Sequence, residues 1–233
     1  MRILAFCAHP DDVEINCAGT LAKSIQRGDE AYIVNACLGD KGHYYIEPKE
    51  IGKMRLRESQ MASKVIGAKV SSLNFSDAEL EINHTNLELF VKKIREINPD
   101  VIITHVPDDY HLDHVAVSKL VVDASFLVSV PHCYPDQKAM EHTPQIYFME
   151  PYTGISFVPQ EFVDITDTFD LKLEMLSCHK SQIEWLKEHD GMDILDFVKV
   201  SAAYRGFQCG VKYAEGFQRL TTALRAIPGR FLP

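Results

Sequence analysis

The chain has 233 residues, of which 46% are hydrophobic, and its formal net charge is −9. This charge argues against a nucleic-acid-binding protein, because such proteins need concentrated Lys and Arg to displace counterions from phosphates. No apolar run approaches the ~18 residues of a membrane span, and the apolar start at 1–8 lacks the length and cleavage site of a signal peptide. We therefore expect a cytoplasmic protein that binds neither nucleic acid nor membranes.

Short apolar runs alternate along the chain with segments in which apolar residues recur at helical spacing. The runs predict buried strands, and glycines such as Gly28 and Gly67 mark helix ends. The first half gives strands at 2–8, 31–38, 71–75 and 100–105, with helices at 18–28, 51–67, 87–97 and 117–124. The second half gives weaker strands at 145–150 and 162–165, followed by helices at 168–188 and 193–204.

This alternation predicts an α/β fold: a Rossmann-like, mostly parallel sheet with helices on both faces, since parallel strands need crossover helices. We expect one domain over 1–233, because no repeat, low-complexity segment or linker divides the chain. Ligands of such sheets bind beyond the carboxyl ends of the strands. Side chains that directly follow strands are therefore the first candidates for a functional site.

Two clusters of ionisable residues follow predicted strands. The first is 9–12 (His-Pro-Asp-Asp), and the second is 111–114 (His-Leu-Asp-His), after the strand at 100–105. Each alone has a structural alternative: a solvated turn or helix cap for the Asp pair, and a helix N-terminus for the second cluster. Their joint occurrence at one sheet edge favours a metal site, since a catalytic zinc takes three His, Asp or Glu ligands and keeps a position for water.

The two clusters together strongly resemble the PIG-L/LmbE family of zinc-dependent N-acetylglucosamine deacetylases, and most of all its bacterial bacillithiol-pathway branch. The resemblance is clear over 1–125 and weak over 130–165. Supporting matches are Arg55-x-x-Glu58, His179-x-Ser181-Gln182 and Tyr213-Ala-Glu215-x-Phe217.

The resemblance implies three metal ligands, which are His9, Asp12 and His114. Two imidazoles and one carboxylate leave a bound Zn²⁺ with net positive charge, so that it remains a Lewis acid and activates a water near neutral pH. Other divalent ions suit such a ligand set as well. We expect Zn²⁺ as the cofactor.

The resemblance also implies catalytic residues beside the metal. Asp11 would be the general base, and His111 would stabilise the developing oxyanion or protonate the leaving amine. Asp113 would orient His111 or a ligand histidine. Arg55 would bind an anionic part of the substrate through its guanidinium, with a helix-surface ion pair to Glu58 or another acid as the structural alternative.

Several further residues stay open between a functional and a structural role. Tyr44, Asp109 and His179 are candidates for substrate contact. Trp185, the single tryptophan, falls on an apolar helix face, which favours a core position. Glu14 is better explained as a helix-start charge than as a ligand.

The implied function is metal-dependent hydrolysis that removes the acetyl group from a small glycoside containing N-acetylglucosamine. The resemblance further implies a homo-oligomer, with hexamers among the related forms. Two alternatives stay open: an amidohydrolase acting on another N-acylated small molecule, and a non-catalytic Rossmann-like binding protein. The second is weakened because 9–12 is not Gly-x-Gly-x-x-Gly, and its carboxylates would repel a pyrophosphate.

Overall fold

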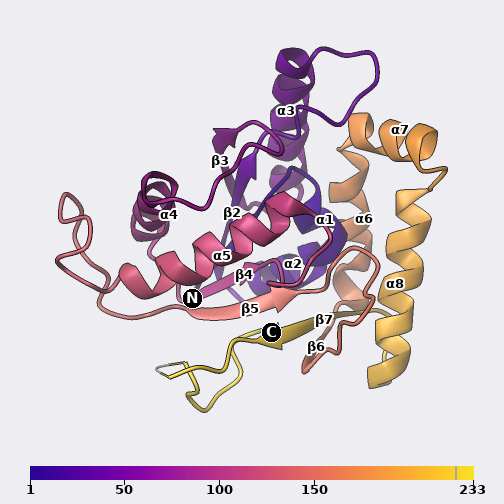
Figure 1. Cartoon of the computed structure of the whole chain (residues 1–233). Coiled ribbons are helices and arrows are strands. Elements are labelled where there is room, and N and C mark those ends of the chain that lie inside the picture. The colour runs from indigo at the N-terminus through magenta and orange to yellow at the C-terminus, as the bar shows by residue number, and fades with distance from the viewer. Residues whose placement is uncertain (224) are drawn as a thin grey trace.

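The computed structural model describes residues 1–223 and 225–233 and is built on a seven-stranded sheet (Figure 1). The strand order is β3-β2-β1-β4-β5-β7-β6. Strands β1 to β5 run parallel, whereas β7 is antiparallel to both β5 and β6. In chain order the strands span Arg2–Cys7, Glu30–Cys37, Lys69–Phe75, Val101–Thr104, Gln145–Met149, Glu161–Asp164 and Ala214–Arg219.

Helices connect the strands, and the local sequence sets several of their ends. From α1 to α8 the described helices span Asp12–Asn16, Ala18–Gln26, Pro48–Ile66, His84–Ile97, Leu112–Leu127, Phe169–Ser177, Lys180–His189 and Ile194–Cys209. Helix α3 has Pro48 in its first turn and ends at Gly67, whose φ of 78° suits a residue without a side chain. Asn83 caps α4 by accepting a hydrogen bond from the Asn86 N–H at 2.9 Å.

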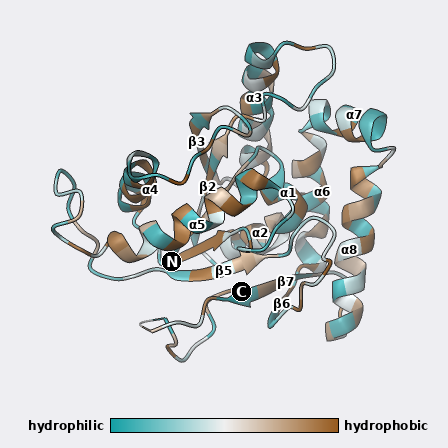
Figure 2. Cartoon of the chain, viewed as in Figure 1, coloured by the Kyte–Doolittle hydropathy of each residue, from teal (hydrophilic) through white to brown (hydrophobic). Residues whose placement is uncertain are grey.

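The helices cover both faces of the sheet. Helices α4 and α5 pack on one face, while α2, α3, α6 and α8 cover the other. Figure 2 shows hydrophobic residues concentrated on the central strands and mixed with hydrophilic ones along the helices. In β1, Ile3 to Cys7 are all buried, as is typical of a parallel strand covered on both sides. The predicted fold class is confirmed.

Two details of the second half differ from the prediction. The expected helix at 168–188 is two helices, α6 and α7, which are separated at Cys178 and His179. Glu58 of α3 stabilises the start of α7, because its carboxylate accepts hydrogen bonds from the Ser181 N–H at 2.9 Å and from the Ser181 hydroxyl. Most of the motif at 213–217 lies in β7, so the sheet has an antiparallel strand that periodicity did not predict.

The strand order reverses at β1, which has β2 on one side and β4 on the other. Helices α1 and α2 follow β1 onto one face of the sheet, whereas α5 follows β4 onto the other. A crevice opens at such a point, because the two connections leave in opposite directions. The loops after β1 and β4, which carry the two clusters, therefore meet at this crevice. No helix of the described residues is long and apolar enough to cross a membrane.

Candidate active site

The first cluster lies in a sharp connection between β1 and α1. The His9 N–H donates to Asp12 Oδ2 at 2.7 Å, and Asp12 is the first residue of α1. Between them Asp11 has a φ of 112°, a backbone conformation that residues with a side chain rarely adopt. Such strain costs roughly 1–3 kcal/mol and often occurs at active sites. The turn lets the adjacent carboxylates of Asp11 and Asp12 reach different partners.

The second cluster meets the first around Asp12. Asp12 Oδ1 lies 3.3 Å from His114 Nε2, and Asp12 Oδ2 lies 3.7 Å from His9 Nδ1. The ring of His111 has its centroid 4.7 Å from that of His9 and 4.8 Å from that of His114. The ligand-type atoms of His9, His111 and His114 lie within 4.8 Å of one another, as do those of Asp12, His105 and His114. The three predicted metal ligands thus stand in one group, flanked by His105 and His111.

This donor set fits a divalent cation. Ligand atoms about 2.0–2.2 Å from a tetrahedral ion lie about 3.3 Å apart, which matches the separation of Asp12 Oδ1 and His114 Nε2. On its other side, His114 Nδ1 lies 3.2 Å from Asp109 Oδ1. Although burial lowers it, the two carboxylates of Asp12 and Asp109 raise the pKa of His114 to about 10. Negative charge therefore surrounds this imidazole, and a cation bound to the neutral ring would balance it.

His105, which directly follows β4, holds the loop after β1. Its Nε2 accepts a hydrogen bond from the Ala8 N–H at 2.9 Å, and its ring stacks on that of His114 with 4.0 Å between centroids. Burial and the neighbouring His114 lower the pKa of His105 to about 4, so the ring is neutral. His105 thus positions the backbone beside His9, since its Nε2 already has a partner.

Asp113 contacts His9. Its Oδ2 lies 3.1 Å from His9 Nε2 and accepts a hydrogen bond from the Ala78 N–H at 2.8 Å, whereas His111 Nδ1 is 4.0 Å away. Of the two roles expected for Asp113, these contacts favour orientation of the ligand histidine. With Nε2 on Asp113, the Nδ1 atom of His9 is the one that remains for a metal.

Asp11 is buried and paired with Arg55. Arg55 Nη2 lies 2.9 Å from Asp11 Oδ1 and also donates to the Pro10 carbonyl, while Nη1 donates to the Gly39 carbonyl at 3.2 Å. Burial raises the pKa of Asp11 to about 6, although Arg55 lowers it. The guanidinium that was expected to bind an anionic part of the substrate thus has partners within the protein, and its role toward the substrate stays a prediction.

His111 begins α5 as its N-cap. Its Nδ1 accepts a hydrogen bond from the Asp113 N–H at 3.2 Å, so the proton of the neutral ring lies on Nε2. Burial and the neighbouring His9 and His114 lower the pKa of His111, which keeps the ring neutral at neutral pH. Since His111 lines the cavity described next, its Nε2–H is a hydrogen-bond donor at the site.

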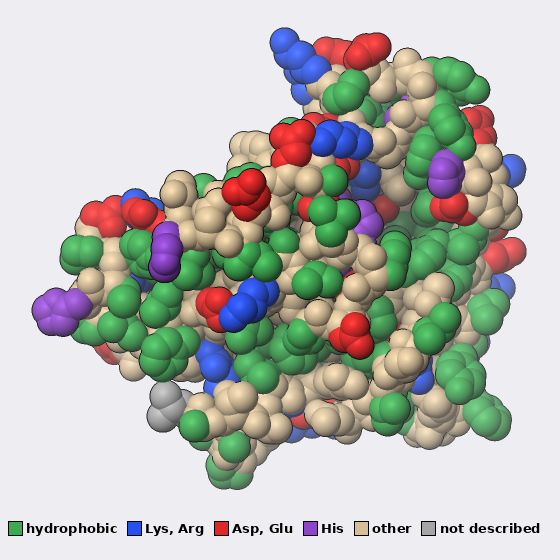
Figure 3. Space-filling model, viewed as in Figure 1, with side chains coloured by type: hydrophobic (Ala, Val, Ile, Leu, Met, Phe, Trp, Pro, Cys, Tyr) green, Lys and Arg blue, Asp and Glu red, His purple; other side chains and the backbone are tan. Residues whose placement is uncertain are grey.

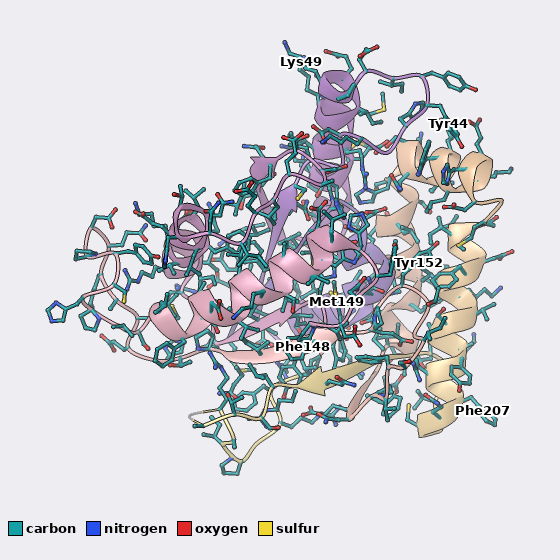
Figure 4. All side chains as sticks on the ribbon, viewed as in Figure 1. Tyr44, Lys49, Phe148, Met149, Tyr152 and Phe207 are labelled. Carbon is teal, nitrogen blue, oxygen red and sulfur yellow. The ribbon has the colours of Figure 1, made fainter. Side chains whose placement is uncertain are left out.

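The cluster opens into a cavity of about 470 Å³, a volume within the range of small-molecule sites. Figure 3 shows this hollow beside α7, with acidic, basic and histidine side chains gathered in it. Tyr110 and Tyr152 line the cavity with 6.4 Å between their ring centroids. Figure 4 places Tyr152 between the start of α5 and α8, so the second half of the chain helps to enclose the site.

Trp185 does not lie in the core, where the apolar face of its helix predicted it. It is half-buried, lines the cavity and stacks on His189 of the same helix, because this face of α7 is turned to the cavity. Tyr44 packs against it with 4.5 Å between ring centroids. His179 is fully buried, and its Nε2 lies 3.4 Å from the buried Glu14 Oε2, which favours a packing role for His179. Glu14 lies in the first turn of α1, the position expected of a helix-start charge.

The strand order and the crevice at β1 define an α/β protein of the Rossmann-like class. A cluster of His and Asp side chains that could hold a metal ion lies at the carboxyl edge of its sheet. The sequence profile of the PIG-L family, described as GlcNAc-PI de-N-acetylase, matches residues 4–125, just over half of the chain. The chain belongs to this family.

Individual relatives agree with this assignment. The chain is 25% identical to diacetylchitobiose deacetylase from Thermococcus kodakarensis, over 99% of this chain and 85% of the relative. It is 27% identical to a probable N-acetyl-alpha-D-glucosaminyl L-malate deacetylase from Bacillus cereus, over 80% of this chain and 86% of the relative. The predicted family resemblance is confirmed.

The same fold also occurs in an enzyme of a different class. The crystal structure of GalB, a 4-carboxy-2-hydroxymuconate hydratase from Pseudomonas putida KT2440, superimposes with a TM-score of 0.85 and 21% identity, over 99% of both chains. The fold alone therefore does not decide the reaction, which must be argued from the site.

Sequence reasoning missed the structural parts that Asp109 and His105 play in the site. The sequence pattern presents Asp109 only as a candidate for substrate contact, yet its carboxylate faces His114. The sequence did contain a signal for Asp109. Metal-binding histidines commonly direct their second ring nitrogen to a carboxylate, and Asp109 precedes His114 by only five residues. His105 ends a predicted strand, which is where side chains reach the site in a parallel sheet.

Proposed function

We propose that the protein is a metal-dependent deacetylase that hydrolyses the acetamide of a small N-acetylglucosamine-containing glycoside. The observation that carries the proposal is the convergence of His9, Asp12 and His114 beside the buried carboxylate of Asp11 in one cavity. These three residues would hold the ion, and we propose Zn²⁺ because two imidazoles and a carboxylate form a common catalytic set for it.

A divalent ion at this position would polarise the amide carbonyl and lower the pKa of a water molecule. Asp113 would fix the ring of His9, and Asp109 would fix the ring of His114, each by contacting the ring nitrogen that does not bind the metal. Partners of this kind commonly change metal affinity 10–100-fold, because they set the tautomer and orientation of the ring. The ligand geometry is thus held by residues on either side of the N-terminus of α5.

Asp11 would act as the general base, accepting a proton from the attacking water and delivering it toward the departing nitrogen. Arg55 holds Asp11 Oδ1, which leaves Oδ2 for the water. The unusual backbone at Asp11 supports this role, since it turns the carboxylate away from the partners of Asp12. A positioned base commonly contributes 10²–10⁴-fold to the rate.

His111 would stabilise the negative charge that develops on the carbonyl oxygen. Its neutral ring carries a proton on Nε2, held in that tautomer by the Asp113 N–H. A preorganised donor of this kind is commonly worth about 10²–10³ in turnover. A neutral ring has no acidic proton to give to the leaving amine, so that proton would come from Asp11.

The proposed substrate class draws on the relatives as well as on the site. The two relatives named above are called deacetylases of diacetylchitobiose and of N-acetylglucosaminyl malate, both of which contain N-acetylglucosamine. The cavity of about 470 Å³ is of a size for such a sugar conjugate.

The test is acetate release by the Zn²⁺-loaded protein from the methyl glycoside of N-acetylglucosamine. We expect acetate and free amine in equal amounts, loss of activity with a chelator and recovery on adding Zn²⁺. Release from N-acetylated amino acids alone would favour a different amidohydrolase. Hydration of an unsaturated dicarboxylic acid without any acetate release, or sugar binding without turnover, would contradict the proposal.

A further inference from the structure

Aromatic side chains form a wall of the cavity outside the proposed metal ligands. The wall joins the loop at 38–47 to α7: the Tyr44 and Trp185 ring centroids are 4.5 Å apart, and Trp185 stacks on His189 at 4.4 Å with 20° between the ring planes. Figure 4 shows Tyr44 beside α7. Tyr44 is 54% exposed, and Trp185 and His189 line the cavity, so a bound molecule can reach this wall.

One stripe of α7 faces the cavity. Gln182, Trp185, Leu186 and His189 recur at spacings of three and four residues, which places them on one side of the helix, and all four line the cavity. Gln182 Oε1 is buried, and no described residue donates a hydrogen bond to it. A buried acceptor without a donor is unfavourable, and a turn of the amide toward the cavity would let a hydroxyl of a bound molecule satisfy it. The stripe combines flat apolar surface with an unsatisfied acceptor.

The charges of the cavity disfavour an anionic group on the aglycone. Two cationic side chains, Lys41 and Arg55, occur among the described lining residues, and both have partners. Lys41 Nζ donates to the Asp77 carbonyl at 2.6 Å and to Glu79 at 2.7 Å, and Arg55 is held by Asp11. The same lining includes the carboxylates of Asp11, Asp12, Asp77 and Asp190.

From these contacts we infer that the α7 stripe is the aglycone subsite and that it takes a neutral second sugar ring stacked on Trp185. The C–H groups on the face of a pyranose carry slight positive charge and meet the negative face of the indole. A ring hydroxyl would donate to Gln182 Oε1. This inference rests on the proposed function, because it assigns the part of the substrate beyond the N-acetylated sugar.

Three glycosides of N-acetylglucosamine, whose aglycones are methyl, glucose and malate, test the subsite. We expect kcat/KM for the glucose-bearing compound to exceed that for the methyl glycoside about tenfold, which corresponds to one stacking contact and one hydrogen bond. Trp185→Ala should remove most of this preference, so that the ratio of kcat/KM for the glucose compound to that for the methyl compound falls toward one, whereas Trp185→Phe should retain part of it. Phe207→Ala, at an 84% exposed position of α8, is the matched control and should change neither.

A binding measurement covers the case in which the Ala variant does not fold. Because Trp185 is the single tryptophan, its fluorescence reports on the subsite without turnover. The deacetylated glucose-bearing product should change the emission saturably in the wild-type protein, and the deacetylated methyl glycoside at equal concentration should not. Gln182→Ala should weaken this response.

The proposed function and the aglycone subsite can each be overturned without the other. Absence of acetate release from every glycoside would overturn the proposed function, while a saturable emission change with the glucose-bearing amine would still support the subsite. An equal loss of kcat/KM for the methyl and glucose compounds in Trp185→Ala would overturn the subsite. A wild-type preference for the malate compound, or an unresponsive emission, would overturn it as well.

Discussion

The two walls of the cavity are built in different ways. On the cluster side, His9, Asp12 and His114 are each less than a tenth exposed, and each contacts an ionisable side chain from a distant segment of the chain. On the α7 side, Tyr44 and His189 are exposed, and aromatic faces mainly contact one another. Substitutions on the buried side should therefore change the chemistry, whereas those on the aromatic side should change the choice of substrate.

The buried side is also anchored to the second half of the chain. Glu215 of β7 accepts hydrogen bonds from the Gly19 and Thr20 N–H groups at the start of α2, at 3.0 and 2.8 Å, and pairs with Lys172 of α6 at 2.6 Å. Lys172 also donates to the Ile15 carbonyl at 2.8 Å. The helices that follow the first cluster are thus held by residues 157 to 196 positions away.

The largest effect is expected when a ligand is removed. His114→Ala should lose most of the bound metal and reduce turnover about 10³-fold or more, since a catalytic ion contributes several kcal/mol to the transition state. Elemental analysis and acetate release measure the two effects, with the exposed His132→Ala as control. Full metal content in the His114 variant would show that the ligand assignment is wrong.

Removing the base should separate chemistry from metal binding. Asp11→Asn keeps the shape of the side chain but cannot accept the proton, so turnover should fall 10²–10⁴-fold while the metal content stays near that of the wild type. Steady-state kinetics and elemental analysis of one preparation provide the comparison. Loss of metal would exchange the roles of Asp11 and Asp12, and unchanged turnover would remove Asp11 from the mechanism.

The anchor to the second half should matter for stability. Lys172→Met leaves the Glu215 carboxylate buried without its cation and should lower the free energy of unfolding by about 3–5 kcal/mol, because both side chains are almost completely buried. Urea denaturation measures this change, and Lys199→Met, at an exposed position of α8, is the control. If both variants lose the same stability, the ion pair does not anchor the helices.

The carboxylate behind His114 should tune metal affinity. Asp109→Asn can still accept the hydrogen bond from the His111 N–H, which is 3.0 Å long, but it removes the charge that faces His114. We expect metal affinity to fall about 10–100-fold, as measured by competition with a chromogenic chelator. Asp108→Asn, at the exposed neighbouring position, should leave the affinity unchanged, and equal affinities for both variants would argue against this role of Asp109.

The smallest effect is expected at Arg55, where two interpretations compete. If the side chain positions Asp11, Arg55→Lys should lower kcat about tenfold by loosening a charge-assisted hydrogen bond, with KM nearly constant for neutral and anionic glycosides alike. If it binds an anionic aglycone, KM for the malate glycoside should rise selectively. Comparing kcat and KM across the two glycosides distinguishes them.

The sequence by itself determined the class of fold and the place of the site. Continuous apolar runs such as 2–8 and the helical spacing between them are local properties, and they are sufficient to indicate parallel strands with crossover helices. Parallel strands present their carboxyl ends at one edge, so residues that follow two such strands must lie near one another. For that reason the clusters at 9–12 and 111–114 could be brought together before any contact was known, while the choice of His9, Asp12 and His114 as ligands came from the family resemblance.

Only the tertiary structure decided how that group is held and what surrounds it. The break between α6 and α7 depends on Glu58, 123 positions away from the Ser181 that it contacts. The exposure of Trp185 depends on which way α7 is turned, and periodicity does not distinguish an apolar face toward the sheet from one toward a cavity. Burial and ion-pair partners arise from residues distant in the chain, so their effects cannot be assigned until the elements are packed together.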